Sequence, residues 1–163
     1  LAGFADASTQ IRLIVLAGPN GSRLIDDTYN ASTPSVFSAL SLLAEVGDGR
    51  KIAVLGDMRE LGNVTEMEHR KVGRRAAEVC DVLFTFGELA RIIGEEAQQT
   101  ASINGRELPV QSFGANETDT LIDVLRETLQ PGDMLLLKGS RGLEMERVVA
   151  ALCEPAPEEE DAP

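Results

Sequence analysis

Two cations and a hydroxyl stand close together near the end of the chain. Lys138, Ser140 and Arg141 alternate with glycines directly after an apolar run. An ammonium, a hydroxyl and a guanidinium in one short loop can bind a carboxylate, to which arginine gives a two-pronged contact. The loop resembles part of a phosphate-binding loop, but the pattern G-x-x-x-x-G-K-[ST] is absent from the chain. We therefore expect a carboxylate site here, and we do not expect this chain to hold and hydrolyse ATP alone.

A second charged segment lies between two glycines at 56–62. It carries Asp57 and Glu60 with an arginine between them. Glycine lets the backbone approach a ligand closely, and such mixed charges could hold a zwitterion. The alternative is a loop with a surface ion pair, which is the commoner outcome of this pattern. His69, the only histidine, follows downstream, and a lone histidine is more often structural than catalytic.

A third segment holds Asp26 and Asp27 at the end of an apolar run, followed in the same turn by Asn30. Such carboxylates can accept hydrogen bonds from ribose hydroxyls or meet a cation. A helix predicted to begin near Pro34 would also favour an anion at its N-terminus. The alternative is that Asp27 or Asn30 only caps the turn, and spacing alone leaves both interpretations open.

Composition and missing motifs argue against several classes of protein. The chain has 27 acidic and 15 basic residues and a net charge of -12, so it would repel nucleic acid and anionic lipid. Its sequence has no G-x-S-x-G turn, no G-x-G-x-x-G fingerprint and no histidine and cysteine cluster. We therefore expect neither a serine hydrolase nor a dinucleotide-dependent dehydrogenase, and no metal site within this chain.

The location of the protein is predicted from simple features. Cys80 and Cys153 lie far apart without C-x-x-C spacing, which is typical of a reducing cytoplasm. No apolar run approaches the roughly 20 residues that cross a bilayer. The chain opens on Leu1 instead of methionine, so we expect it to be part of a longer protein.

The polar segments must be positioned by the elements that precede them. Residues 11–16 and 23–25 are separated by turn residues and predict a hairpin. After it, short apolar runs alternate with amphipathic stretches of helical spacing. The predicted strands are 51–55, 82–86, 108–112 and 134–137. The predicted helices are 34–46, 66–79, 88–99, 117–129 and 143–152.

This alternation predicts an α/β fold: a Rossmann-like three-layer domain with a mostly parallel sheet and an N-terminal hairpin. Ligands of such sheets bind beyond the carboxyl ends of the strands, where all three polar segments fall. We expect the domain to cover residues 1–153. Residues 154–163 are proline, alanine and acid, and predict a disordered acidic tail.

Taken in order, the three segments resemble the C-terminal domain of the Mur ligase family, most closely its D-alanyl-D-alanine-adding members. The likeness covers residues 1 to about 152. It implies that Arg12 and Asp27 meet the nucleotide, with Asp27 on the ribose hydroxyls and Asn30 as a weaker candidate. It also implies that Lys138, Ser140 and Arg141 hold the carboxylate of D-alanyl-D-alanine. Asp57 or Glu60 would then face the amine of the dipeptide or organise the loop.

The resemblance implies a reaction of peptidoglycan synthesis in the cytoplasm. ATP, with Mg²⁺, would phosphorylate the carboxylate of UDP-N-acetylmuramoyl-tripeptide, and the dipeptide amine would attack the acyl phosphate. No catalytic residue is expected within this domain alone. Its share would be to close on a central ATPase domain, which lies outside this chain together with an N-terminal domain.

Two other interpretations stay open. The chain could belong to a sibling Mur ligase or a folylpolyglutamate-type synthetase, although the segment at 138–142 argues for the dipeptide-adding members. It could instead be a non-catalytic α/β module that binds a small molecule, because the phosphate-binding loop is absent. The ligase interpretation requires a gene that extends upstream of Leu1 and encodes G-K-[ST], whereas a methionine start there would favour the module.

Overall fold

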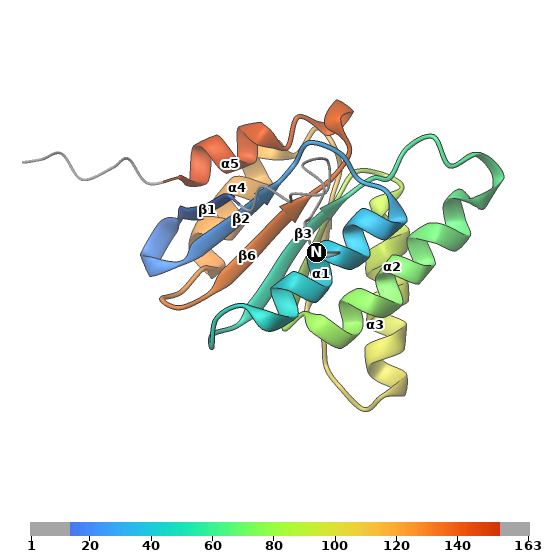
Figure 1. Cartoon of the computed structure of the whole chain (residues 1–163), viewed down its shortest axis with the longest axis horizontal. Helices are drawn as coiled ribbons and strands as arrows, with labels where there is room; N and C mark the ends of the chain where they lie inside the picture. The colour runs from blue at the N-terminus through green and yellow to red at the C-terminus, as the bar shows by residue number, and fades with distance from the viewer. Residues whose placement is uncertain (1–13, 154–163) are drawn as a thin grey trace, which may run out of the picture.

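The computed structural model describes residues 14–153 (Figure 1). Arg12 and the predicted acidic tail at 154–163 therefore lie outside the described residues. Within them, strands form a sheet in the order β1-β2-β6-β3-β4-β5. The strands are β1 (Ile14–Ala17), β2 (Arg23–Asp27), β3 (Lys51–Gly56), β4 (Val82–Phe86), β5 (Val110–Phe113) and β6 (Met134–Lys138).

The sheet combines one hairpin with a parallel body. β1 and β2 pair antiparallel, with Ile14 opposite Asp26, and every other pairing is parallel. In the hairpin turn Asn20 adopts a left-handed φ of 59°. The Asn20 amide donates to the carbonyls of Arg126 and Leu129, at 2.9 and 3.0 Å. The predicted hairpin and mostly parallel sheet are thus confirmed.

Helices cover both faces of the sheet, as Figure 1 shows. They are α1 (Thr33–Glu45), α2 (Thr65–Val79), α3 (Ala90–Ile103), α4 (Thr118–Thr128) and α5 (Glu146–Leu152). Alternate strand residues point to opposite faces. Ala53 and Leu55 therefore join α1, α2 and α3 in one core, while Ile52 and Val54 join α4 and α5 in the other. The sheet therefore lies between two layers of helices, which gives the three predicted layers.

Local signals explain where the helices begin. Ser32 caps α1, because its hydroxyl accepts from the Ser35 N–H and the Ser35 hydroxyl accepts from the Ser32 N–H. α5 begins at Glu146 and not at 143 as predicted, because residues 141–143 form a separate 3-10 turn. Glu144 then takes a left-handed φ of 54°, which interrupts the helical backbone.

All the parallel strands end at one edge of the sheet, so the loops that follow β2, β3 and β6 meet there. The three polar segments of the sequence are therefore neighbours in space, at the edge where ligands of parallel sheets bind.

Within residues 14–153 the structure contains no helix whose length and apolar character would allow it to span a membrane.

The two thiols give a test of this packing. Cys80 is fully buried, and burial raises the pKa of its thiol to about 12. Burial also raises the pKa of the Cys153 thiol, but Cys153 is only half-buried. Because the thiolate is the reactive form, we expect iodoacetamide at mildly alkaline pH to label Cys153 in the folded protein and Cys80 only in denaturant. A Cys153→Ser variant is the control and should take up no label until it unfolds. Labelling of Cys80 as fast as Cys153 in the folded protein would contradict the fold.

Candidate functional site

Two neighbouring clefts open at the carboxyl edge of the sheet. The first cleft has a volume of about 600 Å³, and the second about 480 Å³. The first cleft is lined by Ile14, Asp26, Asp27, Thr28, Tyr29, Arg141 and Glu146. The second cleft is lined by Tyr29, Asn30, Arg59, Glu60, Ser140, Arg141 and Gly142. The loops after β2, β3 and β6 therefore build one continuous region.

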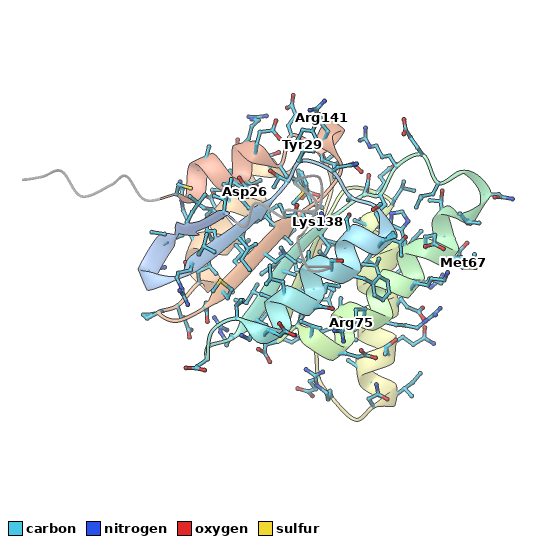
Figure 2. All side chains as sticks on the ribbon, viewed as in Figure 1. Asp26, Tyr29, Met67, Arg75, Lys138 and Arg141 are labelled. Carbon is cyan, nitrogen blue, oxygen red and sulfur yellow. The ribbon has the colours of Figure 1, made fainter. Side chains whose placement is uncertain are left out.

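Tyr29 and Arg141 line both clefts and form the wall between them. The guanidinium carbon of Arg141 lies 4.5 Å from the centroid of the Tyr29 ring, which is a cation–π contact. Figure 2 shows the two side chains together above the sheet, with Asp26 beside them on β2. Tyr29 is 71% exposed, so its ring stands out from the fold instead of filling a core.

Lys138 is buried beneath the first cleft. Its side chain is 2% exposed, and its Nζ donates to Asp27 Oδ2 and to the Asn30 carbonyl, both at 2.9 Å. Asp27 and Lys138 are register partners at the ends of neighbouring strands β2 and β6. The ammonium therefore fixes the Asp27 carboxylate and the turn after it. The Asp27 side chain is still 37% exposed, so it can also meet a ligand in the first cleft.

Asp57 lies beneath the second cleft and its carboxylate points away from it. Asp57 Oδ1 accepts from the Ala90 N–H at 2.7 Å, at the N-terminus of α3. Gly87, with a φ of 112°, leaves the room for this carboxylate, because a Cβ there would overlap it. The Asp57 carbonyl accepts from the Ser140 N–H and hydroxyl, at 3.1 and 2.6 Å. Asp57 and Ser140 thus join the loop after β3 to the loop after β6.

Burial raises the pKa of the Asp57 carboxyl above its ordinary value of 3.8, although the Ala90 N–H and Arg59 act in the opposite direction. A carboxyl with a raised folded pKa stabilises the fold below its ordinary value, and that contribution is lost as the pH rises through the raised value. In Asp57→Asn, which keeps an acceptor for Ala90, the group does not titrate. We expect the free energy of unfolding of the wild type to fall relative to this variant as the pH rises from about 3 to about 7. Urea titrations across that range measure it, and a difference that stays constant or grows would contradict the assignment.

Arg59 and Glu60 are exposed at the second cleft. Glu60 holds a left-handed φ of 63°, a costly conformation for a residue with a side chain, and such strain often marks ligand sites. Arg59 passes directly over Gly142, where any Cβ would overlap its guanidinium. Arg59, Glu60 and Arg141 therefore bring two cations and one anion to the second cleft.

His69 is a structural residue within the fold. It is fully buried, its Nε2 accepts from the Met58 N–H at 3.1 Å, and its Nδ1 lies 2.6 Å from the Thr65 carbonyl. Since Nε2 accepts, Nδ1 must carry the proton that it donates to Thr65. His69 thus anchors the segment that carries Asp57 and Glu60.

The structure gathers the predicted residues but gives them different surroundings. Glu60 and Arg141 are exposed at the clefts, whereas Lys138, Asp57 and Ser140 are buried and bonded to other loops. The Asn30 side chain accepts from the Ala31 N–H at 2.8 Å, and Asn30 lines the second cleft and not the first. The predicted ligand roles of these residues remain predictions.

Sequence reasoning gave no role to Tyr29, and it counted Arg59 only among the mixed charges of the segment at 56–62. Both stood inside segments that were singled out, and Tyr29 is the only tyrosine of a chain without tryptophan. An aromatic residue between two acids and an asparagine, directly after a strand, could have signalled an exposed ring. Nothing in the sequence, however, indicated that its partner would be Arg141.

In open, mostly parallel sheets, small ligands and nucleotides bind beyond the carboxyl ends of the strands, and the two clefts lie there. The chain belongs to the Mur ligase family, because residues 11–141 match the family model described as Mur ligase, glutamate ligase domain. Among curated relatives, the UDP-N-acetylmuramoyl-tripeptide--D-alanyl-D-alanine ligase of Bacillus subtilis is 34% identical over 148 residues, which are 90% of this chain and 31% of the relative. The ligase of the same name from Synechocystis is 38% identical over 130 residues, which are 79% of this chain and 27% of the relative.

Solved structures give the same relationship. The MurF ligase from Thermotoga maritima in complex with ADP matches with a TM-score of 0.69 and 27% identity, over 86% of this chain and 30% of that one. MurF from Acinetobacter baumannii matches with a TM-score of 0.68 and 32% identity, over 85% of this chain and 29% of that one. The chain thus spans about 30% of the length of the relatives it matches.

Proposed function

We propose that this chain is the C-terminal domain, residues 1–153, of an ATP-dependent cytoplasmic ligase that joins D-alanyl-D-alanine to UDP-N-acetylmuramoyl-tripeptide in peptidoglycan synthesis. The observation that carries the proposal is the pair of clefts that share one wall. One has an accessible carboxylate, Asp27, and the other has Arg141, Arg59 and Glu60. Family membership and the names of the relatives support this choice of substrates.

The first cleft is proposed to take the ribose end of the nucleotide. A carboxylate can accept from two neighbouring hydroxyls, and Asp27 is held ready for this by Lys138 at 2.9 Å. Arg12, which lies outside the described residues, keeps its predicted role on the phosphates. Asn30 keeps a weaker role at the nucleotide edge, because it lines the neighbouring cleft.

The second cleft is proposed to take the dipeptide as a zwitterion. Arg141 and Arg59 would bind its carboxylate, for which planar guanidinium groups are well suited, and Glu60 would face its ammonium. Lys138 and Asp57, predicted among the dipeptide-binding residues, are proposed to act beneath the site instead, because their side chains already bond neighbouring loops together. Ser140 lines the second cleft, but its hydroxyl already donates to the Asp57 carbonyl, so we propose that it holds the loop after β6 in place.

In the proposed reaction the tripeptide carboxylate is phosphorylated by ATP, and the amine of the dipeptide displaces phosphate from the acyl phosphate. This domain would position the reactants: it would bring the amine to the acyl carbon and exclude water when the domains close. Magnesium would neutralise the phosphates. No group of three or more histidine, cysteine or acidic side chains fit to hold a metal occurs in residues 14–153, so we assign Mg²⁺ to the nucleotide and the rest of the ligase.

The test is phosphate release by the full-length ligase with ATP, Mg²⁺ and UDP-N-acetylmuramoyl-tripeptide. We expect release that depends on D-alanyl-D-alanine and is absent with a free diamino acid, with glutamate or without an acceptor. Release driven by a diamino acid or by glutamate would move the protein to a sibling ligase or to a folylpolyglutamate-type synthetase. If no acceptor causes phosphate release, the ligase proposal is overturned in favour of a binding module.

A further inference from the structure

Tyr29 is an exposed aromatic residue, whereas each phenylalanine within residues 14–153 is buried or partly buried. It is 71% exposed, whereas Phe84, Phe86 and Phe113 are buried. Exposing a ring of this size forgoes the stabilisation that its burial would give. The contact that occupies its face is the Arg141 guanidinium, 4.5 Å from the ring centroid. The ring therefore has a partner that comes from a loop 112 residues further along the chain.

The turn that carries Tyr29 is held from below. Lys138 donates both to Asp27, two residues before Tyr29, and to the Asn30 carbonyl, one residue after it. Thr28 is held as well, because its N–H and hydroxyl both donate to Asp26 Oδ1, at 3.2 and 2.7 Å. The residues on each side of Tyr29 are thus held in place, so the ring projects from an ordered turn.

The contact with Tyr29 leaves hydrogen-bonding capacity on Arg141. A guanidinium carries five N–H donors, and a cation–π contact does not require that they pair with a carboxylate. Among residues 14–153, no carboxylate forms an ion pair with Arg141. The Tyr29 ring is then the contact that orients this long side chain, and the N–H edge remains open toward the clefts.

We propose that Tyr29 is a positioning residue for the acceptor: its ring orients Arg141 so that the guanidinium edge meets the carboxylate of the dipeptide in the second cleft. This inference rests on the proposed function for the identity of the ligand. Because Asp27 and Tyr29 share one anchored turn, Tyr29 also sets the spacing between the nucleotide cleft and the acceptor cleft.

The kinetic test compares Tyr29→Leu and Tyr29→Phe in the full-length ligase. Tyr29→Leu removes the π face, and we expect it to raise the KM for D-alanyl-D-alanine about tenfold, within the range of a cation–π contact. The KM for ATP should change less than about twofold. Tyr29→Phe keeps the face and should restore the KM of the wild type. Ile103→Ala, which alters another exposed apolar side chain (77% exposed) on α3, is the matched control and should change neither constant.

A double-mutant comparison shows whether Tyr29 acts through Arg141. In an Arg141→Ala background, Tyr29→Leu should give no further rise in the KM for the dipeptide, because the residue to be oriented is gone. A full additional tenfold rise would overturn the proposal. So would a Tyr29→Leu effect confined to the KM for ATP, which would make the ring a surface for the nucleotide.

A measurement without substrates separates this inference from the proposed function. Protons over a ring face resonate upfield, so NMR of the 163-residue chain should show upfield-shifted δ-methylene protons of Arg141 that return to ordinary values in Tyr29→Leu. Unshifted protons in the wild type would overturn the positioning role even if the ligase is active. A shift without dipeptide-dependent phosphate release would preserve the contact and overturn the ligand assigned to it.

Discussion

Replacing Lys138 by alanine should lower the free energy of unfolding by about 3 kcal/mol, the order expected when a buried ion pair loses one partner. The ammonium is 2% exposed and donates to Asp27 and to the Asn30 carbonyl. Its removal leaves two acceptors without a donor and a cavity between β2 and β6. The partial exposure of Asp27, at 37%, keeps the loss below the upper end for such pairs. Urea denaturation of the 163-residue chain measures it.

Two further variants identify the cause of that loss in the free energy of unfolding. Lys71→Ala on α2 removes an exposed lysine that pairs with Glu68, and should cost less than about 0.5 kcal/mol. Lys138→Met fills most of the cavity but lacks the charge, so it separates lost volume from lost hydrogen bonds. A Lys138→Ala cost no larger than that of Lys71→Ala would mean that the lysine does not hold the turn after β2.

Removing the guanidinium of Arg141 should act on the acceptor and spare the fold. For Arg141→Ala in the full-length ligase, we expect the KM for D-alanyl-D-alanine to rise roughly 10- to 150-fold, the factor that corresponds to a hydrogen bond to a charged group. The KM for ATP should stay near its wild-type value. Steady-state kinetics with each substrate varied in turn measure both constants.

Arg141→Lys and Arg75→Ala are the matched variants. Lysine keeps the charge but loses the planar fork, so most of the rise in KM should persist in Arg141→Lys. Arg75 lies on α2, away from the clefts (Figure 2), and pairs with Glu78, so its removal should leave both constants unchanged. Equal rises in the KM for ATP and for the dipeptide in Arg141→Ala would remove the assignment of Arg141 to the acceptor.

The structure also changes which Asp27 variant is informative. Asp27→Ala would remove the proposed ribose contact and leave the Lys138 ammonium buried without its carboxylate. Such a variant mixes a loss of stability with a loss of nucleotide binding. Asp27→Asn keeps an oxygen for Lys138, so it reports more directly on the ribose contact.

Much of the fold was predictable because each strand and helix carries its own signal. The run at 134–137 is continuously apolar and the run at 82–86 is interrupted only by Thr85, which is typical of strands buried on both faces. Both form strands at or within a residue of those limits. The start of α5 was predicted at residue 143, but Leu143 belongs to the 3-10 turn at 141–143 and α5 begins at Glu146. The left-handed φ of Glu144, which separates the turn from the helix, has no signal in the pattern of apolar residues.

The site was predictable as a region but not in detail. Parallel strands bring their carboxyl ends to one edge, so the polar segments after them could be expected to meet. The sequence could not indicate which charges turn inward, because that depends on partners 33 to 111 positions away. Lys138 pairs with Asp27 across 111 positions, and without that register partner it looked like an open cation. Arg59 and Arg141 are the cations that reach the second cleft.

The two clefts are proposed to hold the nucleotide and the dipeptide side by side. A crystal structure of the full-length ligase with ADP and D-alanyl-D-alanine would locate both ligands. We expect the ribose hydroxyls within hydrogen-bond distance of Asp27 in the first cleft, and the dipeptide carboxylate on the edge of Arg141 in the second. A dipeptide bound away from Arg141, or a ribose held by residues of another domain with Asp27 left facing solvent, would contradict the account.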